Sequence, residues 1–505
     1  MRHDYRLRRA VRLRYIPGAL FSLGLAADIA LSAEYAADTK ASEPWRAEMS
    51  GPDDTKLRLE VYDRIRGEFA DWFGDQIVNG RVVPKQSDYS FMANKFQLGL
   101  RVTGKPFEAF AQFQDTVLAG LPDNGVGVGS LYFTNVPHTT QNGAFLRQGW
   151  AKLKHDGFYL TGGRQLYTDW APGPARNKNL KWIQDYRLSQ RLIGPWDYTH
   201  TGRSFDGGTV GYLSDDFEVS TFAFMPTFGG FDTNGMNTIT NINVAGATLG
   251  LRDSEAIGNT IGRLSYYYYK DDRNLLVPDN RPDDARNAAK GQALEIHTIG
   301  AAAAHVLPAG PGLLDGMFYA FGQLGNWQNL NQRAWAYGVE LGYQFPDVWA
   351  SPWLRAGINS GSGDSNPNDG EHQTFFQMLP TVFLYAQFPF YNMMNNQDVF
   401  VQALAKPHPM VNLRVDFHWL KVNESRDLLY SGSGATSDKV FGYVGTPTGG
   451  FDDLAYLTHF TVNVKPLEYL SFNFVYGHAF GQDIINAQYT GKQGDYGFME
   501  AIVSF

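Results

Sequence analysis

The sequence predicts an all-β protein, a single closed antiparallel transmembrane β-barrel of about 16–18 strands, with 18 favoured, long extracellular loops and short periplasmic turns. Apolar and polar residues alternate in many segments from residue 55 to the end. Aromatic residues, which barrels place in girdles at both membrane interfaces, are abundant, with 27 Tyr, 35 Phe and 11 Trp. The chain ends on Phe505, preceded at alternate positions by Val503, Ala501 and Met499, a pattern typical of the assembly signal of bacterial outer-membrane proteins.

Composition limits the class of protein further. The 505 residues carry a formal net charge of −8 and a mean hydropathy of −0.31. Beyond residue 35 there is no apolar run of about 18 residues, which excludes a helical membrane protein but leaves alternating strands possible. The acidic balance argues against nucleic acid as a partner. Because the chain lacks Cys, a disulfide framework and cysteine zinc sites are excluded.

The N-terminus has the pattern of an export signal. An Arg-rich stretch is followed by the apolar stretch 17–27 and by small residues. We expect the general secretory route, insertion by the barrel assembly machinery, and contact with lipid and lipopolysaccharide in the cell outer membrane. The chain then divides into a signal peptide over 1–33 with cleavage at about 30–37, an N-terminal periplasmic segment over 34–54, and the barrel over 55–505.

Strands, turns and loops can be placed from local patterns. Strict alternation is clearest in 96–103, 335–344, 411–419 and 470–477. Clusters of Gly, Pro, Asp and Ser predict short turns at 104–106, 155–157 and 214–216. Long polar stretches predict loops, which could fold over the mouth or into the lumen: 122–143, 171–205, 227–255, 278–292, 359–374, 423–453 and 481–494.

Alternation also predicts which charged side chains face the lumen. Within 57–69 the apolar set defines the outer face, so Arg58, Arg64 and Arg66 point inward. An Arg on the lipid face near the midplane would cost about 2–4 kcal/mol, which favours the inward direction for every strand Arg. The same rule places these residues in the lumen: Arg101, Arg263, Arg355 and Arg414.

Inward arginines admit two interpretations. Collectively they would build a positive field that favours anions, since guanidinium groups pair bidentately with carboxylates. Individually they could serve only to tie the wall together, because acidic residues of the same parity are available as partners. These are Glu60, Glu68, Glu108, Glu340 and Asp416.

The middle of the chain carries its most distinctive motifs. Gly-Gly-Arg-Gln occupies 162–165, Arg-Leu-Ile-Gly occupies 191–194, and Gly-Arg-Ser-Phe-Asp-Gly occupies 202–207. A glycine-rich stretch, 357–364, then precedes the Thr-Phe and Pro segment 374–380. In this order the set resembles the alginate export family of outer-membrane proteins, over roughly 55–505.

The resemblance implies an 18-stranded barrel that exports an acidic polyuronate through an electropositive constriction. It places Arg147 and Arg164 in that constriction, with Arg101 and Arg64 or Arg66 as two further members. The departures are Asn359, where the family has Arg, and Ser471 and Asn473, where an Arg pair is expected. The candidate lumenal set, with the motif residues added, is Arg64, Arg66, Arg101, Arg147, Arg164, Arg191, Arg203, Asp206 and Arg355.

Three functions are compared on this basis. The first is a channel or exporter for an acidic polysaccharide such as alginate, which would need periplasmic export partners to deliver the polymer. The second is a passive uptake porin for small carboxylates or other organic anions. The third, a barrel enzyme such as a lipase, lacks a convincing nucleophile and His pair, so we expect no catalytic residues.

No cofactor is expected, with one candidate metal site to consider. Asp364, Asn366, Asn368 and Asp369 resemble the oxygen-rich start of a calcium loop. However, the glycine comes one position late for an EF-hand, and no closing Glu follows at the required offset. A solvated turn explains the same residues.

Overall fold

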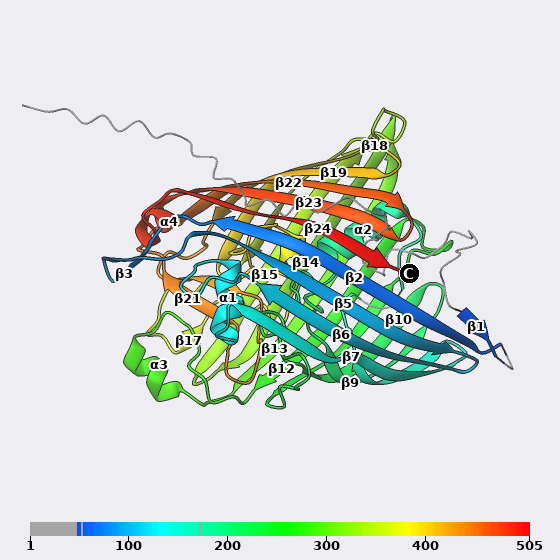
Figure 1. The fold of residues 1–505 in the computed structure, drawn as a ribbon, viewed down its shortest axis with the longest axis horizontal. Helices are drawn as coiled ribbons and strands as arrows, with labels where there is room; N and C mark the ends of the chain where they lie inside the picture. Colours follow the sequence, from blue (N-terminus) through cyan, green and yellow to red (C-terminus); the bar gives the residue numbers. More distant parts are fainter. Residues whose placement is uncertain (1–47, 52–53, 171–172) are drawn as a thin grey trace, which may run out of the picture.

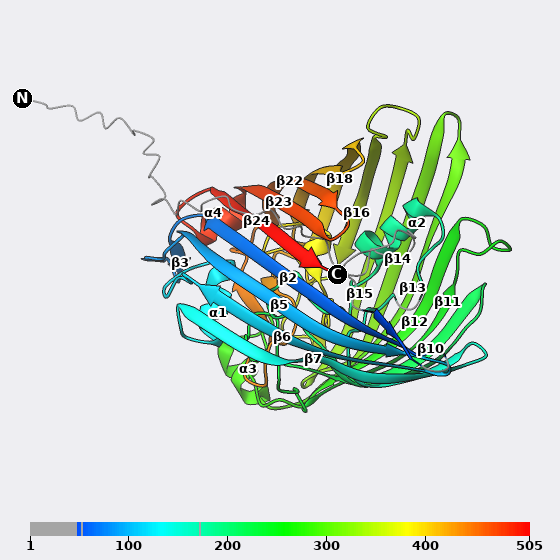
Figure 2. The same cartoon turned by 45° about the vertical axis from the view of Figure 1, so that its right-hand side comes forward.

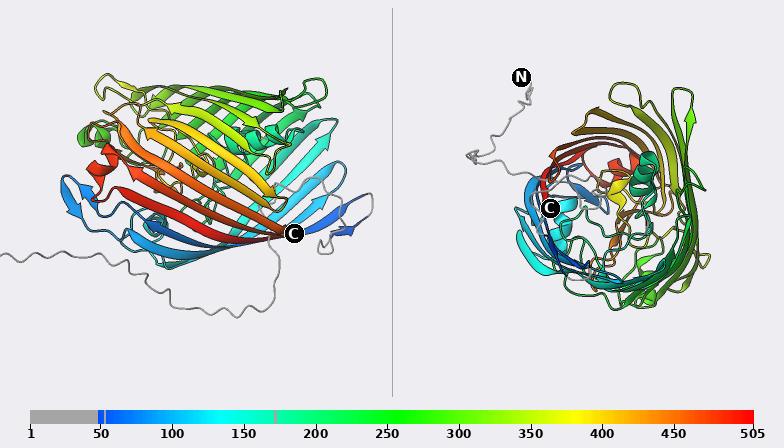
Figure 3. Two further views of the ribbon diagram at one scale, coloured as in Figure 1. Left: turned by 90° about the horizontal axis from the view of Figure 1, so that it is seen from above. Right: turned by 90° about the vertical axis from the view of Figure 1, so that its right-hand side faces the viewer.

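The computed structural model describes residues 48–51, 54–170 and 173–505, so the predicted signal peptide lies outside the described residues. Eighteen antiparallel strands form a closed barrel, because β2 (Lys56–Asp71) pairs with β24 (Gln493–Ser504) on one side and with β5 (Asp88–Thr103) on the other. Figure 3 shows this ring end-on in its right-hand view. The predicted fold class is confirmed, with the favoured count of 18 strands.

Each strand pairs with its neighbours in sequence, as in an up-and-down barrel. The other barrel strands are β6 (Phe107–Ala119), β7 (Thr140–His155), β8 (Phe158–Gln165), β9 (Phe205–Leu213), β10 (Phe217–Pro226), β11 (Ile242–Leu251), β12 (Thr260–Asp271), β13 (Leu294–Ala309), β14 (Gly312–Trp327), β15 (Leu330–Gln344), β16 (Trp353–Gly361), β18 (Asn396–His408), β19 (Val411–Lys421), β22 (Asp453–Leu467) and β23 (Leu470–Gly481).

The two ends of the barrel differ in the length of their connections. Short turns join β5 to β6, β7 to β8 and β9 to β10 at one end, where the C-terminus also lies (Figure 1). Long loops leave the other end, except between β14 and β15, which only Gln328 and Asn329 separate. By the habit of outer-membrane barrels the long-loop end is extracellular and the short-turn end periplasmic.

Short helices and strands lie in the connections at the ends of the barrel and in the loops that enter it (Figures 1 and 2). β1 (Glu48–Ser50) lies in the predicted periplasmic segment and pairs with the start of β2. Among the described residues, no helix is both long and apolar enough to span a membrane. The remaining elements are β3 (Gln76–Val78), β4 (Arg81–Val83), α1 (Val128–Asn135), α2 (Lys178–Ile183), η1 (Gln184–Leu188), α3 (Asp283–Ala289), β17 (Glu371–His372), η2 (Val382–Leu384), β20 (Leu428–Gly432), β21 (Tyr443–Pro447) and α4 (Asp483–Gln488).

Side-chain exposure alternates along the strands as the sequence pattern predicts. On β2, Ile65 and Phe69 are exposed at the outer face, whereas Arg64, Arg66 and Glu68 are buried in the lumen. The physical reason is the lipid, which accepts the apolar set and excludes the charged one.

One predicted loop is wrong. The stretch 227–255 contains β11, which pairs with β10 and β12 over its whole length. Five of its ten residues are Gly, Ala or Asn, so its composition resembles a loop. Pairing with two neighbouring strands satisfies its backbone groups, which outweighs the weak strand propensity of these residues.

Two long loops fold into the barrel rather than over it. The first inward loop, 166–204, carries α2 and η1, and the second inward loop, 362–395, carries η2; α2 lies within the ring of strands in Figure 3. They pair with each other, since the amide of Leu379 donates to the Leu192 carbonyl at 2.8 Å and the amide of Gly194 donates to the Leu379 carbonyl at 2.8 Å.

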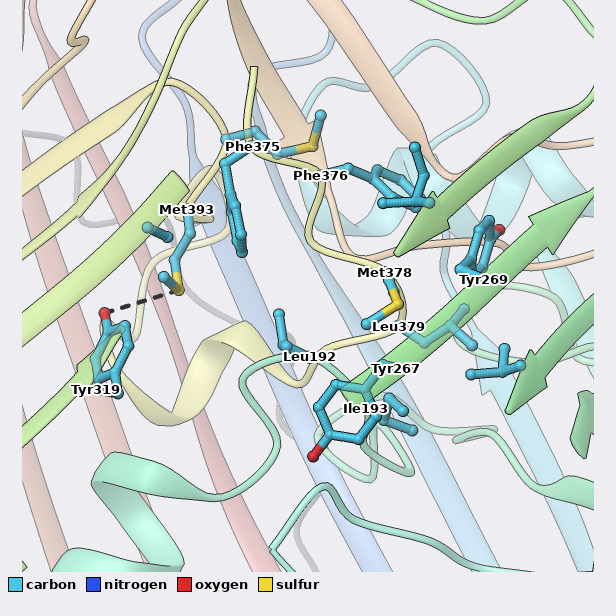
Figure 4. Packing of buried hydrophobic residues seen from close by; sticks show 14 of the residues in the cluster. Leu192, Ile193, Tyr267, Tyr269, Tyr319, Phe375, Phe376, Met378, Leu379 and Met393 are labelled. Atoms are coloured by element: carbon cyan, nitrogen blue, oxygen red, sulfur yellow. Dashed lines mark hydrogen bonds between the residues drawn. The ribbon is translucent and has the colours of Figure 1, made fainter. Parts of the chain in front are cut away.

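Apolar packing holds these loops in place. Leu192 and Ile193 of the first loop and Leu379 of the second are fully buried against lumenal wall residues such as Tyr267 and Tyr319 (Figure 4). Complete burial of a Leu or Ile side chain contributes about 1.5–3 kcal/mol, so this cluster is a core in its own right.

Candidate functional site

Four cations and three carboxylates meet where the first inward loop touches β2, β5 and β7. Asp197 of that loop accepts from Lys95 on β5 at 2.9 Å and from Arg147 on β7 at 2.7 Å. Arg64 on β2 donates to the backbone carbonyls of Asp197 and Thr199 at 3.0 and 2.9 Å. We call Lys95, Arg147, Arg64 and Asp197 the cation cluster.

Asp197 is the most exposed of the charged side chains that pair in the cation cluster. Its side chain is 45% exposed, whereas those of Lys95 and Arg147 are 2% and 1% exposed. Burial by itself would raise the pKa of Asp197, but the charges of Lys95 and Arg147 outweigh it and lower the pKa to about 2. Asp197 is therefore ionised at neutral pH and cancels part of the positive charge behind it.

The rest of the charge at this place lies deeper. Arg66 donates to Glu500 at 2.7 Å and to Glu68 at 3.2 Å. His200 of the first inward loop contacts Glu68 at 2.6 Å, and burial lowers the pKa of His200 to about 4, so it is neutral. Counted as formal charges, Arg66, Glu68 and Glu500 together with the cation cluster leave a surplus of one positive charge.

A second group of arginines lies against β15. Arg187 of η1 makes a bidentate contact with Glu340 at 2.7 and 2.8 Å, and Arg355 on β16 donates to the same carboxylate at 3.1 Å. Arg355 also pairs with Asp315 on β14. Arg191 lies 3.5 Å from Glu340 and between two Tyr rings. Three arginines thus share two carboxylates, again with a surplus of one.

Two more predicted residues, Arg101 and Arg203, lie inside the barrel. Arg101 pairs with Glu60 at 2.6 Å and with Glu108 at 2.9 Å, and its side chain is 25% exposed. Arg203 has no acidic partner among the ion pairs that the described residues form, and donates instead to two backbone carbonyls of the loop after β19, at 3.0 Å each. Burial lowers the pKa of Arg203 to about 9, so it remains charged at neutral pH.

Arg164 and Asp206 are placed differently. Arg164 shares the parity of Phe158 and Leu160, both exposed at the outer face, and lies one residue before the end of β8. It makes a bidentate contact with Asp206 at 2.7 and 2.8 Å and also donates to the Leu146 carbonyl at 3.2 Å. The pair therefore neutralises itself at the point where β8 leaves the wall.

The three positions that depart from the family pattern carry uncharged side chains. Asn359 is buried, accepts from the Tyr319 hydroxyl at 2.9 Å and donates to Asp398 at 3.3 Å. Asn473 donates to Glu500 at 2.7 Å, while the Ser471 hydroxyl is buried without a partner. The positive charge of this lumen accordingly lies towards β2, β5, β7 and β15.

Towards the periplasmic end, the inward side chains of β2 and of β5 to β7 are partly exposed. A chain of amides follows this part of the wall across the neighbouring strands β7, β6 and β5, from Gln148 to Gln112 at 2.9 Å and from Gln112 to Gln97 at 3.3 Å. The half-exposed lining includes Arg58, Glu60, Gln97, Arg101, Glu108, Gln112, Gln148, Trp150 and Lys152.

One further group of residues has metal-ligating chemistry. Candidate ligand atoms of Asp416, His418 and His459 lie within 4.8 Å of one another, and all three residues are buried. Arg414 donates to Asp416 Oδ2 at 2.7 Å, and Asp398 pairs with His418 at 2.8 Å. The carboxylate already has a cationic partner, so this group can balance its charge without a metal.

Sequence reasoning missed Lys95, Asp197 and Arg187. Lys95 alternates with Phe96 in the pattern of β5, so parity could have placed it in the lumen. Asp197 and Arg187 lie in a non-periodic loop, where no sequence signal indicates the direction of a side chain.

A closed barrel with an apolar outer face and a charged lumen narrowed by inward loops is the architecture of an outer-membrane porin-type channel. Solved porins share this fold. OccK8 (OprE) of Pseudomonas aeruginosa is 12% identical with a TM-score of 0.52, over 89% of this chain and 98% of that one. OccAB4 of Acinetobacter baumannii is 12% identical with a TM-score of 0.54, over 88% and 98%. OpdK of P. aeruginosa, solved with vanillate, is 10% identical with a TM-score of 0.52, over 88% and 98%.

The chain belongs to the alginate export family, whose model matches residues 64–497. No curated protein matches it significantly. Family and fold together identify a porin-type barrel of the outer membrane, surrounded by its lipids.

Proposed function

We propose that this channel passes anionic solutes and that its preferred cargo is an acidic polysaccharide of the alginate type. The observation that carries the proposal is the surplus of positive charge around the cation cluster, where Lys95, Arg147 and Arg64 face one lumenal carboxylate. Cations that line a low-dielectric pore lower the barrier for anions and raise it for cations. Membership of the alginate export family supports a polyuronate as the anion.

The alternative is uptake of small carboxylates through the same lumen. The two inward loops favour it, because they are paired to each other and packed into the core beside the cation cluster. A polymer would require a continuous path past them, whereas a small anion needs only a local one. OpdK, a barrel of the same fold, was solved with the small aromatic carboxylate vanillate.

Export of a polymer also implies partners. A channel of this kind is passive, so we expect envelope proteins to deliver the polysaccharide at its periplasmic end. The partly exposed inner wall at that end, with Arg101, Trp150 and the Gln97 to Gln148 amides, offers charged, aromatic and hydrogen-bonding groups to a hydroxylated acid.

Current through single barrels in a planar bilayer tests both forms of the proposal. A polyuronate that blocks the current reversibly from the periplasmic side, with free passage of small organic anions, supports the exporter. Saturable conduction of a small carboxylate without block by the polymer supports uptake. Cation selectivity of the folded barrel in a KCl gradient would refute both, because either cargo needs a positive lumen. A neutral glucan of equal length serves as the control polymer.

A further inference from the structure

Two buried carboxylates at the extracellular end have no cationic partner. Asp364, in the second inward loop, is 0% exposed, and Asp427, in the loop between β19 and β22, is 2% exposed. They are in direct contact, since the amide of Asp364 donates to Asp427 Oδ2 at 2.9 Å. Neither residue takes part in an ion pair within the described part of the chain. Burying an unpaired carboxylate is costly, so this arrangement calls for a positive charge or a proton.

The hydrogen bonds show where a cation would bind. Asp427 is satisfied, accepting from Thr374, Leu428 and Tyr430 as well as from Asp364. Asp364 Oδ1 accepts from the amide of Asn366 at 2.9 Å, but its Oδ2 is buried without a partner.

A second unsatisfied oxygen belongs to a neighbouring loop. Asn280, between β12 and β13, donates through its Nδ2 to the Asp364 carbonyl at 2.9 Å. Its Oδ1 is also buried without a partner. Buried oxygens that lack a donor are candidate ligands for a cation, and Asp364 and Asn280, which are joined through the Asp364 carbonyl, each contribute one.

We propose that Asp364 Oδ2 and Asn280 Oδ1 bind a hard divalent cation, Ca²⁺ in particular, with Asp427 contributing the second negative charge. Carboxylate and amide oxygens are the ligands that Ca²⁺ prefers, and waters complete its coordination. The three residues come from three extracellular loops, so the ion clamps these loops together at the mouth of the barrel.

The site differs from the calcium loop that the sequence suggests. Asn366, Asn368 and Asp369 are exposed. Asn366 Oδ1 accepts from the amide of Asn368 at 3.2 Å, and Asp369 Oδ1 from the amide of Glu371 at 2.9 Å, so these oxygens stabilise turns. Only Asp364 is common to the sequence pattern and to the proposed site.

The competing explanation is that a bound proton, and not a cation, neutralises the buried carboxylates. Burial raises the pKa of Asp364 to about 6 and that of Asp427 to about 6. A proton on Asp364 would neutralise the carboxylate and compete with a cation for it. Cation binding that needs the ionised form of Asp364 should therefore weaken as the pH falls from 7.5 to 5.

Calorimetric titration of the chelator-treated barrel in detergent with Ca²⁺ alone tests the proposal at pH 7.5 and pH 5. We expect saturable binding at pH 7.5, the stated weakening at pH 5, and an apparent Tm that rises by about 3–5 °C at a hundredfold excess over Kd. Asp364→Asn, which preserves the size of the side chain, should abolish the binding, and Asn280→Ala should weaken it about tenfold.

The matched control is Asp369→Asn, which removes a charge from an exposed position of the same loop and should leave Ca²⁺ binding within about twofold. Folding of every variant is verified by its heat-modifiable mobility. Absence of Ca²⁺ binding by the unmodified barrel at pH 7.5, or equal binding by Asp364→Asn, overturns the proposal. If Asp364→Asn does not fold, undiminished binding by Asn280→Ala overturns it equally.

Discussion

Replacing Asp197 by Asn should increase anion passage. The substitution removes the carboxylate that Lys95 and Arg147 share at 2.9 and 2.7 Å, while keeping an oxygen that can accept from both. An anion that approaches these cations comes within about 4 Å of the position of Asp197, where a unit charge in water contributes about 1 kcal/mol. Removing that repulsion lowers the barrier by the same amount, which corresponds to about a fivefold rise in the anion-to-cation permeability ratio.

The assay is the reversal potential of single channels in a planar bilayer under a KCl gradient. At high salt the effect should shrink, because the solvent-exposed charge is screened. Asp156→Asn is the control, since it removes the same charge from a fully accessible periplasmic turn, 87% exposed and remote from the inward loops. A folded Asp197→Asn barrel whose permeability ratio is unchanged or falls would show that the cation cluster does not face the path of the ions.

Two further predictions concern the arginines and the pH dependence. Arg147→Gln should lower the anion-to-cation permeability ratio by about twofold to fivefold. Arg164→Gln should leave the ratio unchanged, because Asp206 already neutralises Arg164. Reversal potentials measure both variants, and equal effects would contradict the different positions of the two arginines. His200 should make the barrel less stable in acid. In the folded chain the pKa of His200 is lowered to about 4, whereas in the unfolded chain it is near 6.5. Between these pH values the unfolded chain binds a proton that the folded chain does not bind. The free energy of unfolding therefore falls by up to about 3 kcal/mol as the pH drops from 6.5 to 4. His200→Gln should flatten the dependence of apparent Tm on pH between 7 and 4, and a parallel curve would refute this role.

Much of the wall could be read from the residues themselves. Alternation of Ile65 and Phe69 with Arg64 and Arg66 predicts the outer and inner faces, because lipid excludes charge. The same rule failed for β11, whose small residues carry little pattern, and its strand is established by pairing with β10 and β12. Periodicity is a local property and can be recognised in the sequence. Strand pairing joins residues that are far apart in the sequence, and composition does not indicate which residues these are.

The site was only partly predictable. Parity and family resemblance pointed to Arg64 and Arg147, and both meet at the cation cluster. Their electrostatic effect, however, depends on Asp197, which follows Arg64 by 133 residues and lies in a loop without periodic pattern. Its position follows from the packing of the two inward loops against the wall.

By itself, the sequence determined a closed barrel with a charged lumen and an apolar exterior, since lipid and water impose those faces on every strand separately. The tertiary structure decided which of the arginines keep an uncompensated charge. The charge of Arg164 is compensated by Asp206, whereas Arg147 and Lys95 share the single carboxylate of Asp197. Charge compensation acts over a few ångströms, and only folding brings such partners to that distance.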